Sequence, residues 1–280
     1  MAISIPERAR DLAAVPLARA DELGDQLAFY GKAYGSIPRA LSRYKREVMA
    51  QMGAITFGSG ALAAVGGSAA VVGFINAMTG AEISTQGYAS LRNVGIEALT
   101  GLFVAFISIR MVVPVVAAVA LVATVGAGIT AELGARRISD EIDALEVMAV
   151  QPIPFLVGTR LIAGLASITP LYALALLMSW LAAKVAAISF YGLSSGAYDH
   201  YFATFVAPGD VLVSYIEVVV MSIVVVSIHC YYGFTAKGGP AGVGVAVGRS
   251  VRLSLVLVLV TLFALTLVLY GNSTTLHISR

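Results

Sequence analysis

Residues 132–150 read Glu132-Leu-Gly-Ala-Arg-Arg-Ile-Ser-Asp-Glu-Ile-Asp-Ala-Leu-Glu-Val-Met-Ala-Val150, and this polar stretch separates two long apolar runs. Seven acidic and basic residues fall within these nineteen positions, although only 12% of the whole chain is charged. Apolar residues recur in the stretch at the spacing of one helical face, and they are Ile138, Ile142, Leu145 and Ala149. The pattern predicts a short amphipathic helix with acids on its other face.

The flanking residues indicate where this helix begins and ends. Ser139 is a good N-cap, and Asp140 and Glu141 suit the positive end of a helix. Pro152 and Pro154 stop it. We therefore predict a helix over residues 139–150, suspended between membrane spans as a docking element.

The composition is that of an integral membrane protein. Hydrophobic residues make up 59% of the chain and the mean hydropathy is +0.88. Only 12% of the residues are charged, whereas soluble domains carry about 25% charged residues. The net charge of +2 is too small to suggest nucleic-acid binding, and the single cysteine, Cys230, excludes an internal disulfide framework or a Cys-rich metal site. The charged, mixed N-terminus lacks the early apolar segment of a cleavable signal peptide.

Five apolar runs are long enough to cross a bilayer, which takes about 20 helical residues. They cover about 48–81, 98–131, 153–183, 211–236 and 253–276. Residues 1–47 place four apolar or aromatic side chains on one helical face, namely Leu23, Leu27, Tyr30 and Tyr34. This face predicts one or two helices lying in the membrane interface, with an ordinary soluble amphipathic helix as the alternative. The fold class is an all-α membrane protein.

Basic residues predict the orientation. Segments on the N-terminal side of the membrane contain 13 Lys and Arg residues, and those on the other side contain three. The positive-inside rule then places the N-terminus inside, the C-terminus outside and the 139–150 helix in the cytoplasm. Residues 82–97 are expected to be a short polar link, and residues 184–210, rich in Tyr and Phe, an interfacial helix or a surface for an external partner.

Polar and small residues within the spans are open to two interpretations. Arg110 either faces a partner or water inside the membrane or extends to the interface. Glu217 is either a proton site or a hydrated or hydrogen-bonded group near a helix end. The glycines of the first span permit close helix packing or an irregular backbone beside a cavity.

No motif in the chain predicts an enzyme. The stretch Gly238–Arg249 lacks the Lys and the Ser or Thr that a Walker A loop requires, and its Gly244 and Gly248 form instead a G-x-x-x-G packing pair. The three histidines are scattered, and no nucleophile has a base at recognisable spacing. We expect no metal site and no nucleotide site in this chain.

Residues 130–153 resemble the signature of the MlaE/YrbE permease family, and the similarity extends through Arg110 and Pro114 upstream and Thr159-Arg160 downstream. It covers most of the chain from about residue 40, so that residues 48–280 would form the permease domain. The resemblance implies an interfacial N-terminal helix, five spans and a dimeric permease of an ABC transporter that moves lipids with MCE-domain proteins. It also implies that the helix between spans two and three couples to a separate ATPase.

Residues 231–234 and the glycine-rich stretch after them are similar to the actinobacterial B-type YrbE subunits of Mce systems, which pair with an A-type subunit beneath six Mce proteins. Three positions depart from the family pattern. The acid of Arg-Glu-Leu-Gly-Pro is missing in Arg110-Met-Val-Val-Pro114, Thr124 replaces an Arg, and Gln151 replaces the Asp of Met-Gly-Val-Asp-Pro. The lost charges suit a heterodimer in which one half has diverged.

The leading hypothesis is a non-catalytic lipid permease subunit in the cytoplasmic membrane. The chain itself would bind no cofactor, since ATP and Mg²⁺ would lie on a partner ATPase. The candidate ATPase-coupling residues are Glu132, Arg136, Arg137, Asp140, Glu141, Ile142, Asp143, Leu145, Glu146 and Met148. Among them Ile142, Leu145 and Met148 are the expected anchors, while the acids steer the partner. The candidate substrate-path residues are Gly58, Gly66, Gly67, Arg110, Pro114 and Thr124.

Two other functions remain as alternatives. A proton-coupled secondary transporter would use Glu217 and Arg110, although no inverted repeat is visible. The second alternative is a non-transporting membrane anchor for an extracellular Mce assembly. The sequence leaves open the lipid, the direction of transport and whether the dimer contains one or two kinds of permease.

Overall fold

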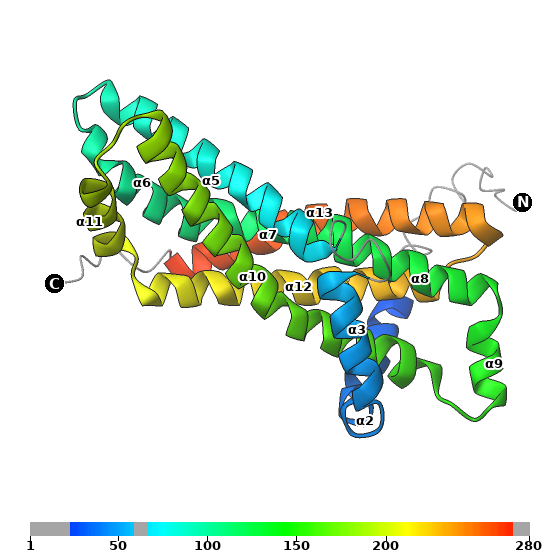
Figure 1. The fold of residues 1–280 in the computed structure, drawn as a ribbon. Coiled ribbons are helices and arrows are strands. Elements are labelled where there is room, and N and C mark those ends of the chain that lie inside the picture. Colours follow the sequence, from blue (N-terminus) through cyan, green and yellow to red (C-terminus); the bar gives the residue numbers. More distant parts are fainter. Residues whose placement is uncertain (1–22, 59–66, 271–280) are drawn as a thin grey trace, which may run out of the picture.

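The computed structural model describes residues 23–58 and 67–270, and every regular element in these ranges is helical. Long helices lie side by side, with the short helix α9 (Glu141–Val147) at one end of the bundle and α11 (Ser195–Phe205) at the other (Figure 1). An all-α membrane protein is therefore confirmed for the described chain.

The longest apolar helix runs from Glu97 to Ile138 and contains 42 residues. It is built from η2 (Glu97–Leu99), α6 (Thr100–Ile107), η3 (Ser108–Val112), α7 (Val113–Leu121), η4 (Val122–Gly126) and α8 (Ala127–Ile138). At about 1.5 Å per residue it measures roughly 63 Å, about twice the ~30 Å hydrocarbon thickness. One helix thus joins the two ends of the bundle.

Two segments of this long helix, η3 and η4, are π-helical. Pro114 is the second residue of α7, which follows η3. A proline lacks an N–H donor and clashes with the carbonyl four residues earlier, so the wider π turn lets the helix pass Pro114 without ending. The helix is therefore continuous through Pro114, with the π segment η3 just before it.

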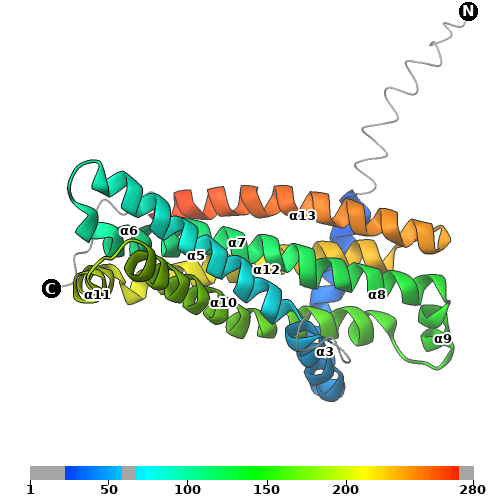
Figure 2. The same cartoon turned by 45° about the horizontal axis from the view of Figure 1, so that its top comes forward.

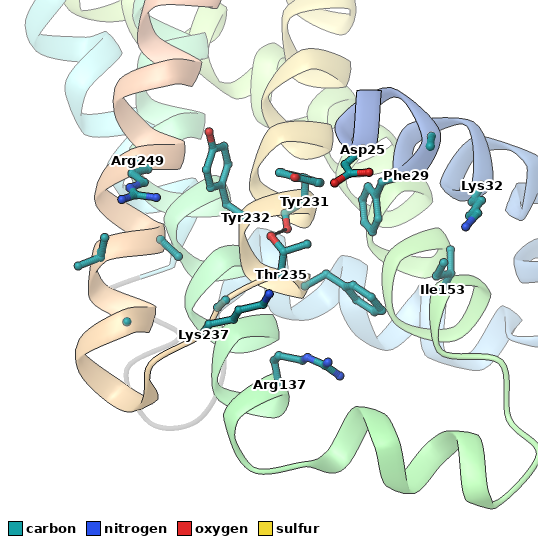
Figure 3. Close-up of a pocket in the computed structure, with 16 residues that line it drawn as sticks. Asp25, Phe29, Lys32, Arg137, Ile153, Tyr231, Tyr232, Thr235, Lys237 and Arg249 are labelled. Atoms are coloured by element: carbon teal, nitrogen blue, oxygen red, sulfur yellow. Dashed lines mark hydrogen bonds between the residues drawn. The ribbon is translucent and has the colours of Figure 1, made fainter. Parts of the chain in front are cut away.

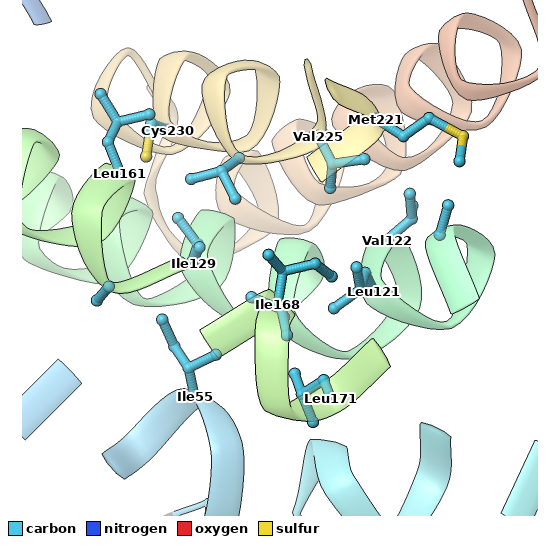
Figure 4. Packing of buried hydrophobic residues seen from close by; sticks show 14 of the residues in the cluster. Ile55, Leu121, Val122, Ile129, Leu161, Ile168, Leu171, Met221, Val225 and Cys230 are labelled. Carbon is cyan, nitrogen blue, oxygen red and sulfur yellow. The ribbon is translucent and has the colours of Figure 1, made fainter. Parts of the chain in front are cut away.

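Three further helices are long and apolar enough to span a membrane. They are the run η5 (Ile153–Gly158), α10 (Thr159–Val185) and η6 (Ala186–Phe190), then α12 (Pro208–Phe234), and then α13 (Gly239–Tyr270). The core lies where α7, α8, α10 and α12 meet. Figure 4 shows Ile129 and Val122 packed against Ile168 and Leu171 of α10 and Val225 of α12. In contrast, α13 covers α8 and α12 with one face and leaves the rest of its surface open (Figure 2).

The N-terminal region consists of a helix over residues 23–35, α2 (Ile37–Arg43) and α3 (Lys45–Phe57). Figure 1 shows α3 crossing the long axis of the bundle. The first of these helices buries Phe29 and Ala33 against the bundle, and the Phe29 ring lies 5.5 Å from that of Tyr231. Leu23 and Leu27 on the predicted apolar face stay exposed, which leaves that face available to a membrane surface.

The first predicted span, 48–81, differs most from the structure. The helix α3 ends at Phe57, and the backbone of Gly58 has a φ of 79°, a conformation that favours glycine at a helix end. A separate helix, α5 (Ser68–Arg92), then includes residues that we expected in a polar link. Polar side chains are accommodated there because Gln86 donates a hydrogen bond to Glu82 at 2.8 Å and the Thr85 hydroxyl donates to the carbonyl of Ala81.

The bounds of the last predicted span also differ. It was expected to begin at residue 253, but α13 begins at Gly239, so the glycine-rich stretch is helical and not a loop. The G-x-x-x-G pair does not pack within the described chain, since a Cβ at Gly244 or Gly248 would meet nothing within 4 Å. The close helix approach occurs elsewhere. A Cβ at Gly80 of α5 would overlap the backbone carbonyl of Ser179 on α10.

Candidate functional site

The short helix α9 is held between two residues with left-handed backbone. Asp140 precedes it and Ala149 follows it, each with a φ of 57°. At its end the N–H of Val150 donates to the carbonyl of Leu145 at 2.9 Å and that of Ala149 donates to Glu146 at 3.0 Å. This pair of bonds is a Schellman motif, and it turns the chain sharply back toward the bundle.

The two apolar sides of α9 have different environments. Ile142 is 1% exposed and belongs to the buried cluster that also contains Leu133 and Leu156. Leu145 packs against the same cluster. Val147 and Met148, in contrast, are 89% and 64% exposed. Of the three anchors predicted from the sequence, Ile142 is therefore buried in its own chain and Leu145 is partly buried, whereas Met148 is exposed beside Val147.

The predicted helix bounds of 139–150 are also corrected to Glu141–Val147. Ser139 is the C-cap of α8 and donates to the carbonyl of Arg136, so it does not cap α9. Asp140 occupies the N-cap position but makes no side-chain cap bond. The helix ends before Pro152 because the left-handed Ala149 has already turned the chain.

The charged residues beside α9 form ion pairs within the chain. Arg137 donates to Asp143 at 2.7 Å and so joins α8 to α9. Glu132 accepts from Arg136 at 3.1 Å and from Arg160 of α10 at 2.6 Å. Arg160 is 1% exposed. These contacts make the end of the bundle a connected unit, while the acids Asp140, Glu141 and Glu146 are exposed.

The N-terminal helices contact the segment that follows α9. Arg39 donates to the side-chain oxygen of Gln151 at 2.7 Å, and the ring of Tyr44 lies 5.1 Å from that of Phe155. Burial raises the pKa of Tyr30, which packs against the same end of the bundle. The segment after α9 is thereby fixed to the N-terminal helices.

A hollow of about 610 Å³ lies between α5, α6 and η3, away from α9. Met78, Ile83, Phe103, Ile107 and Val112 give it an apolar lining. Its polar lining residues are Thr79, Glu82 and Gln86, all on α5. An apolar wall with one polar edge suits a molecule with a hydrocarbon part and a polar head.

Arg110 lies in η3 and has a partner. Its guanidinium donates to both carboxylate oxygens of Asp210, with a closest distance of 2.9 Å, and it also lies over the Phe106 ring at 4.7 Å. Asp210 stands in the first turn of α12, where a carboxylate suits the positive end of the helix. Of the two interpretations that the sequence left open, the structure therefore supports the first, since Arg110 faces a partner within the chain.

The other predicted path residues are not gathered at one place. Pro114 is buried in α7, and Thr124 donates to the carbonyl of Ala120 one turn back. Gly58 ends α3, and Gly67 is the N-cap of α5. Gly66 lies outside the described residues.

One buried polar cluster within the bundle escaped the sequence analysis, whereas Glu217 was named there as a proton site or as a hydrated or hydrogen-bonded group. Thr130 hydrogen-bonds the Nδ1 of His229 at 2.7 Å and Ser250 at 3.2 Å, which ties α8, α12 and α13 together. Glu217 is fully buried, and its oxygens have no hydrogen-bond partner among the described residues. No group of three His, Cys, Asp or Glu side chains in the described ranges could hold a metal ion.

At the α11 end, Lys184 of α10 donates to Asp199 of α11 at 2.8 Å. This hydrogen bond and the charge of Lys184 lower the pKa of Asp199. The helix α11 appears within the segment where the sequence allowed an interfacial helix. Together with the long apolar helices, these features define a multi-pass helical membrane protein with a compact, charged helix at one end.

Comparison with known proteins narrows this class. The family model of the MlaE permease matches residues 57–268. A probable ABC transporter permease protein of Rickettsia prowazekii is 27% identical over 196 residues, which cover 70% of this chain and 76% of that protein. The intermembrane phospholipid transport system permease protein MlaE of Haemophilus influenzae is 27% identical over 193 residues, covering 69% and 74%. The chloroplastic protein TRIGALACTOSYLDIACYLGLYCEROL 1 of Arabidopsis thaliana is 26% identical over 157 residues, covering 56% and 45%.

The chain belongs to the MlaE permease family. It is a non-catalytic permease and a multi-pass protein of the inner membrane. The predicted family is confirmed, whereas the B-type subtype stays a prediction.

Proposed function

We propose that this chain is the permease subunit of an ABC-type lipid transporter, and that a separate ATPase docks on α9. The observation that carries the proposal is the exposed pair Val147 and Met148 beside the acids of α9, on a helix that is itself fastened to the bundle. An apolar pair surrounded by carboxylates suits a groove with an apolar floor and a basic rim. The names of the relatives support the same role.

The long helix Glu97–Ile138 supplies a mechanical link between the two ends. At one end Arg137 and the buried Ile142 hold α9 to α8. At the other end the same helix supplies Phe103 and Ile107 to the lining of the 610 Å³ hollow. A displacement of α9 on nucleotide binding would therefore reach the hollow, and the π segments η3 and η4 are the places where this helix can bend.

The hollow between α5, α6 and η3 is the proposed lipid site of this subunit. Its apolar wall would contact acyl chains, and Glu82, Thr79 and Gln86 would contact the polar head. ATP and Mg²⁺ would be bound by the ATPase. The positive-inside rule supports a cytoplasmic α9 and an external α11, which would place the hollow on the side where MCE-domain proteins would receive or deliver the lipid.

A second permease, either the same chain or an A-type paralogue, would complete the transporter. The support is the open surface of α13, where Val256, Leu259, Val260, Phe263 and Val268 are all more than half exposed. Gly244 and Gly248 on this helix also have free space around them within the described chain. Small residues on an open helix face permit a close approach by another helix.

The ATPase contact is tested with Val147→Asp/Met148→Asp in the complete transporter. We expect the ATPase to be lost on purification, because two charges would replace the apolar contact. The control is Val94→Asp/Phe190→Asp, which charges two exposed apolar positions away from α9. Normal ATPase stoichiometry in the first variant would contradict the proposal. An Ile142→Asp variant would not serve, because that residue is buried in the chain itself.

A further inference from the structure

A hollow of about 850 Å³ lies at the α9 end between the helix 23–35, α8, α12 and α13. It is separate from the proposed lipid site of α5, α6 and η3. Its lining combines four basic side chains with one carboxylate, and they are Lys32, Arg137, Lys237, Arg249 and Asp25. The charge of the hollow is thus strongly positive.

The basic residues come from four different parts of the fold. Figure 3 shows Lys237 and Arg137 below Thr235, Arg249 on the neighbouring helix α13 and Lys32 on the N-terminal helix. Arg137 is paired with Asp143. In residues 23–58 and 67–270, no carboxylate lies within ion-pair distance of Lys32, Lys237 or Arg249. Cations that line one hollow and have no ion-pair partner of their own favour an anionic ligand.

The rest of the lining is aromatic and apolar. Phe29 and Tyr231 form one wall, with Phe234 and Ile153 beside them. The helix 23–35 that closes this wall also exposes Leu23 and Leu27, as a helix lying in the membrane interface would. A small soluble anion would make no apolar contact with these walls, whereas the glycerol and first acyl carbons of a lipid would pack against them.

We propose that this hollow binds the phosphate of an anionic glycerophospholipid from the cytoplasmic leaflet. Lys237 and Arg249 bind the headgroup phosphate, and Phe29 and Tyr231 contact the glycerol region. The inference rests on the proposed orientation, with α9 in the cytoplasm, and not on the choice of transported lipid. The bound lipid would connect the N-terminal helix to α12 and α13.

The experiment uses the purified full chain with its ATPase in mild detergent and measures lipid retention by native mass spectrometry. The probes are dioleoyl-phosphatidylglycerol and dioleoyl-phosphatidylcholine at equal concentration. We expect the wild type to retain phosphatidylglycerol in preference to phosphatidylcholine. The affinity of Lys237→Gln/Arg249→Gln for phosphatidylglycerol should be about tenfold lower, since two charge-assisted contacts are removed. The variant Lys237→Arg/Arg249→Lys should keep the preference, because the charges remain.

The matched control is Arg43→Gln/Lys45→Gln, which removes two cations from the N-terminal helices without touching the hollow. It should retain phosphatidylglycerol as the wild type does. An equal loss in this control, or no loss in Lys237→Gln/Arg249→Gln, would overturn the site. Displacement of the lipid by millimolar inorganic phosphate would overturn the lipid assignment in favour of a free phosphate. Docking of the ATPase is scored separately by its stoichiometry in the same spectra, so the two proposals can fail independently.

Discussion

A single carboxylate, Glu132, connects two parts of the bundle. It accepts a 2.6 Å bond from Arg160, whose side chain is 1% exposed, while Glu132 itself is 44% exposed. A buried guanidinium that loses its counter-ion is costly, about 3–5 kcal/mol for a fully buried pair, whereas exposed pairs contribute about 0–1 kcal/mol. The Glu132–Arg160 pair lies between these limits because one partner is half exposed. Glu132, which we predicted as a coupling residue, therefore also has a structural role.

We predict that Glu132→Ala lowers the free energy of unfolding by about 2 kcal/mol, because Arg160 then loses its carboxylate partner and keeps, within the described chain, only its bond to the carbonyl of Leu156. The measurement is thermal unfolding of the purified chain in detergent. Arg136→Gln is the control, since it removes only the exposed contact of Glu132, and it should change stability by less than about 0.5 kcal/mol. Equal effects of the two substitutions on stability would show that the Glu132–Arg160 pair stabilises the protein no more than the exposed Glu132–Arg136 pair does.

At the scale of one element, α9 depends on the backbone of Ala149. Non-glycine residues in the left-handed conformation cost roughly 1 kcal/mol, and glycine avoids this cost. Ala149→Gly should therefore stabilise the end of α9 by about 0.5–1 kcal/mol. The measurement is amide hydrogen exchange of Ala149 and Val150, which make the two Schellman bonds and should exchange more slowly. Ala144→Gly, within α9, is the control and should have the opposite effect.

The packing of α5 on α10 depends on Gly80. A Cβ at this position would overlap the carbonyl oxygen of Ser179. Gly80→Leu should therefore separate the two helices and destabilise the protein by about 2 kcal/mol or more. The control is Gly73→Ala on the same helix, where a Cβ would lie 3.6 Å from Leu174 in ordinary contact. If thermal unfolding of Gly80→Leu matched the wild type, the close α5–α10 contact would be wrong.

At the scale of the whole molecule, the two ends of the bundle should be separable by mutation. Met78→Trp adds a large side chain at the hollow of α5, α6 and η3, and it should lower lipid transport about tenfold while the ATPase stays bound. Phe74→Trp, one turn earlier on α5, alters an exposed residue outside the lining and is the control. The measurement is ATP-dependent transfer of fluorescent phospholipid in proteoliposomes. Equal transport by Met78→Trp and the wild type would exclude this hollow from the lipid path.

Sequence periodicity and composition were enough to predict an all-helical membrane protein and a short amphipathic helix after the second apolar run, because helical spacing and apolar length are local properties of the chain. The motif over residues 130–153 also predicted the family. Other features depend on contacts between distant segments. Ile142 is buried and Val147 is exposed because α9 folds back on α8. The spacing of apolar residues along one helix does not predict this contact between two helices.

The ion pair of Arg110 and the basic hollow also depend on contacts between distant segments. Arg110 and Asp210 are 100 positions apart, and the cations Lys32, Arg137, Lys237 and Arg249 come together only when α13 and the N-terminal helix pack beside α12. The sequence by itself therefore determined the class of protein and the approximate location of the short helix α9. Only the tertiary structure decided which side chains face outward, because burial and charge pairing depend on the packing of distant helices.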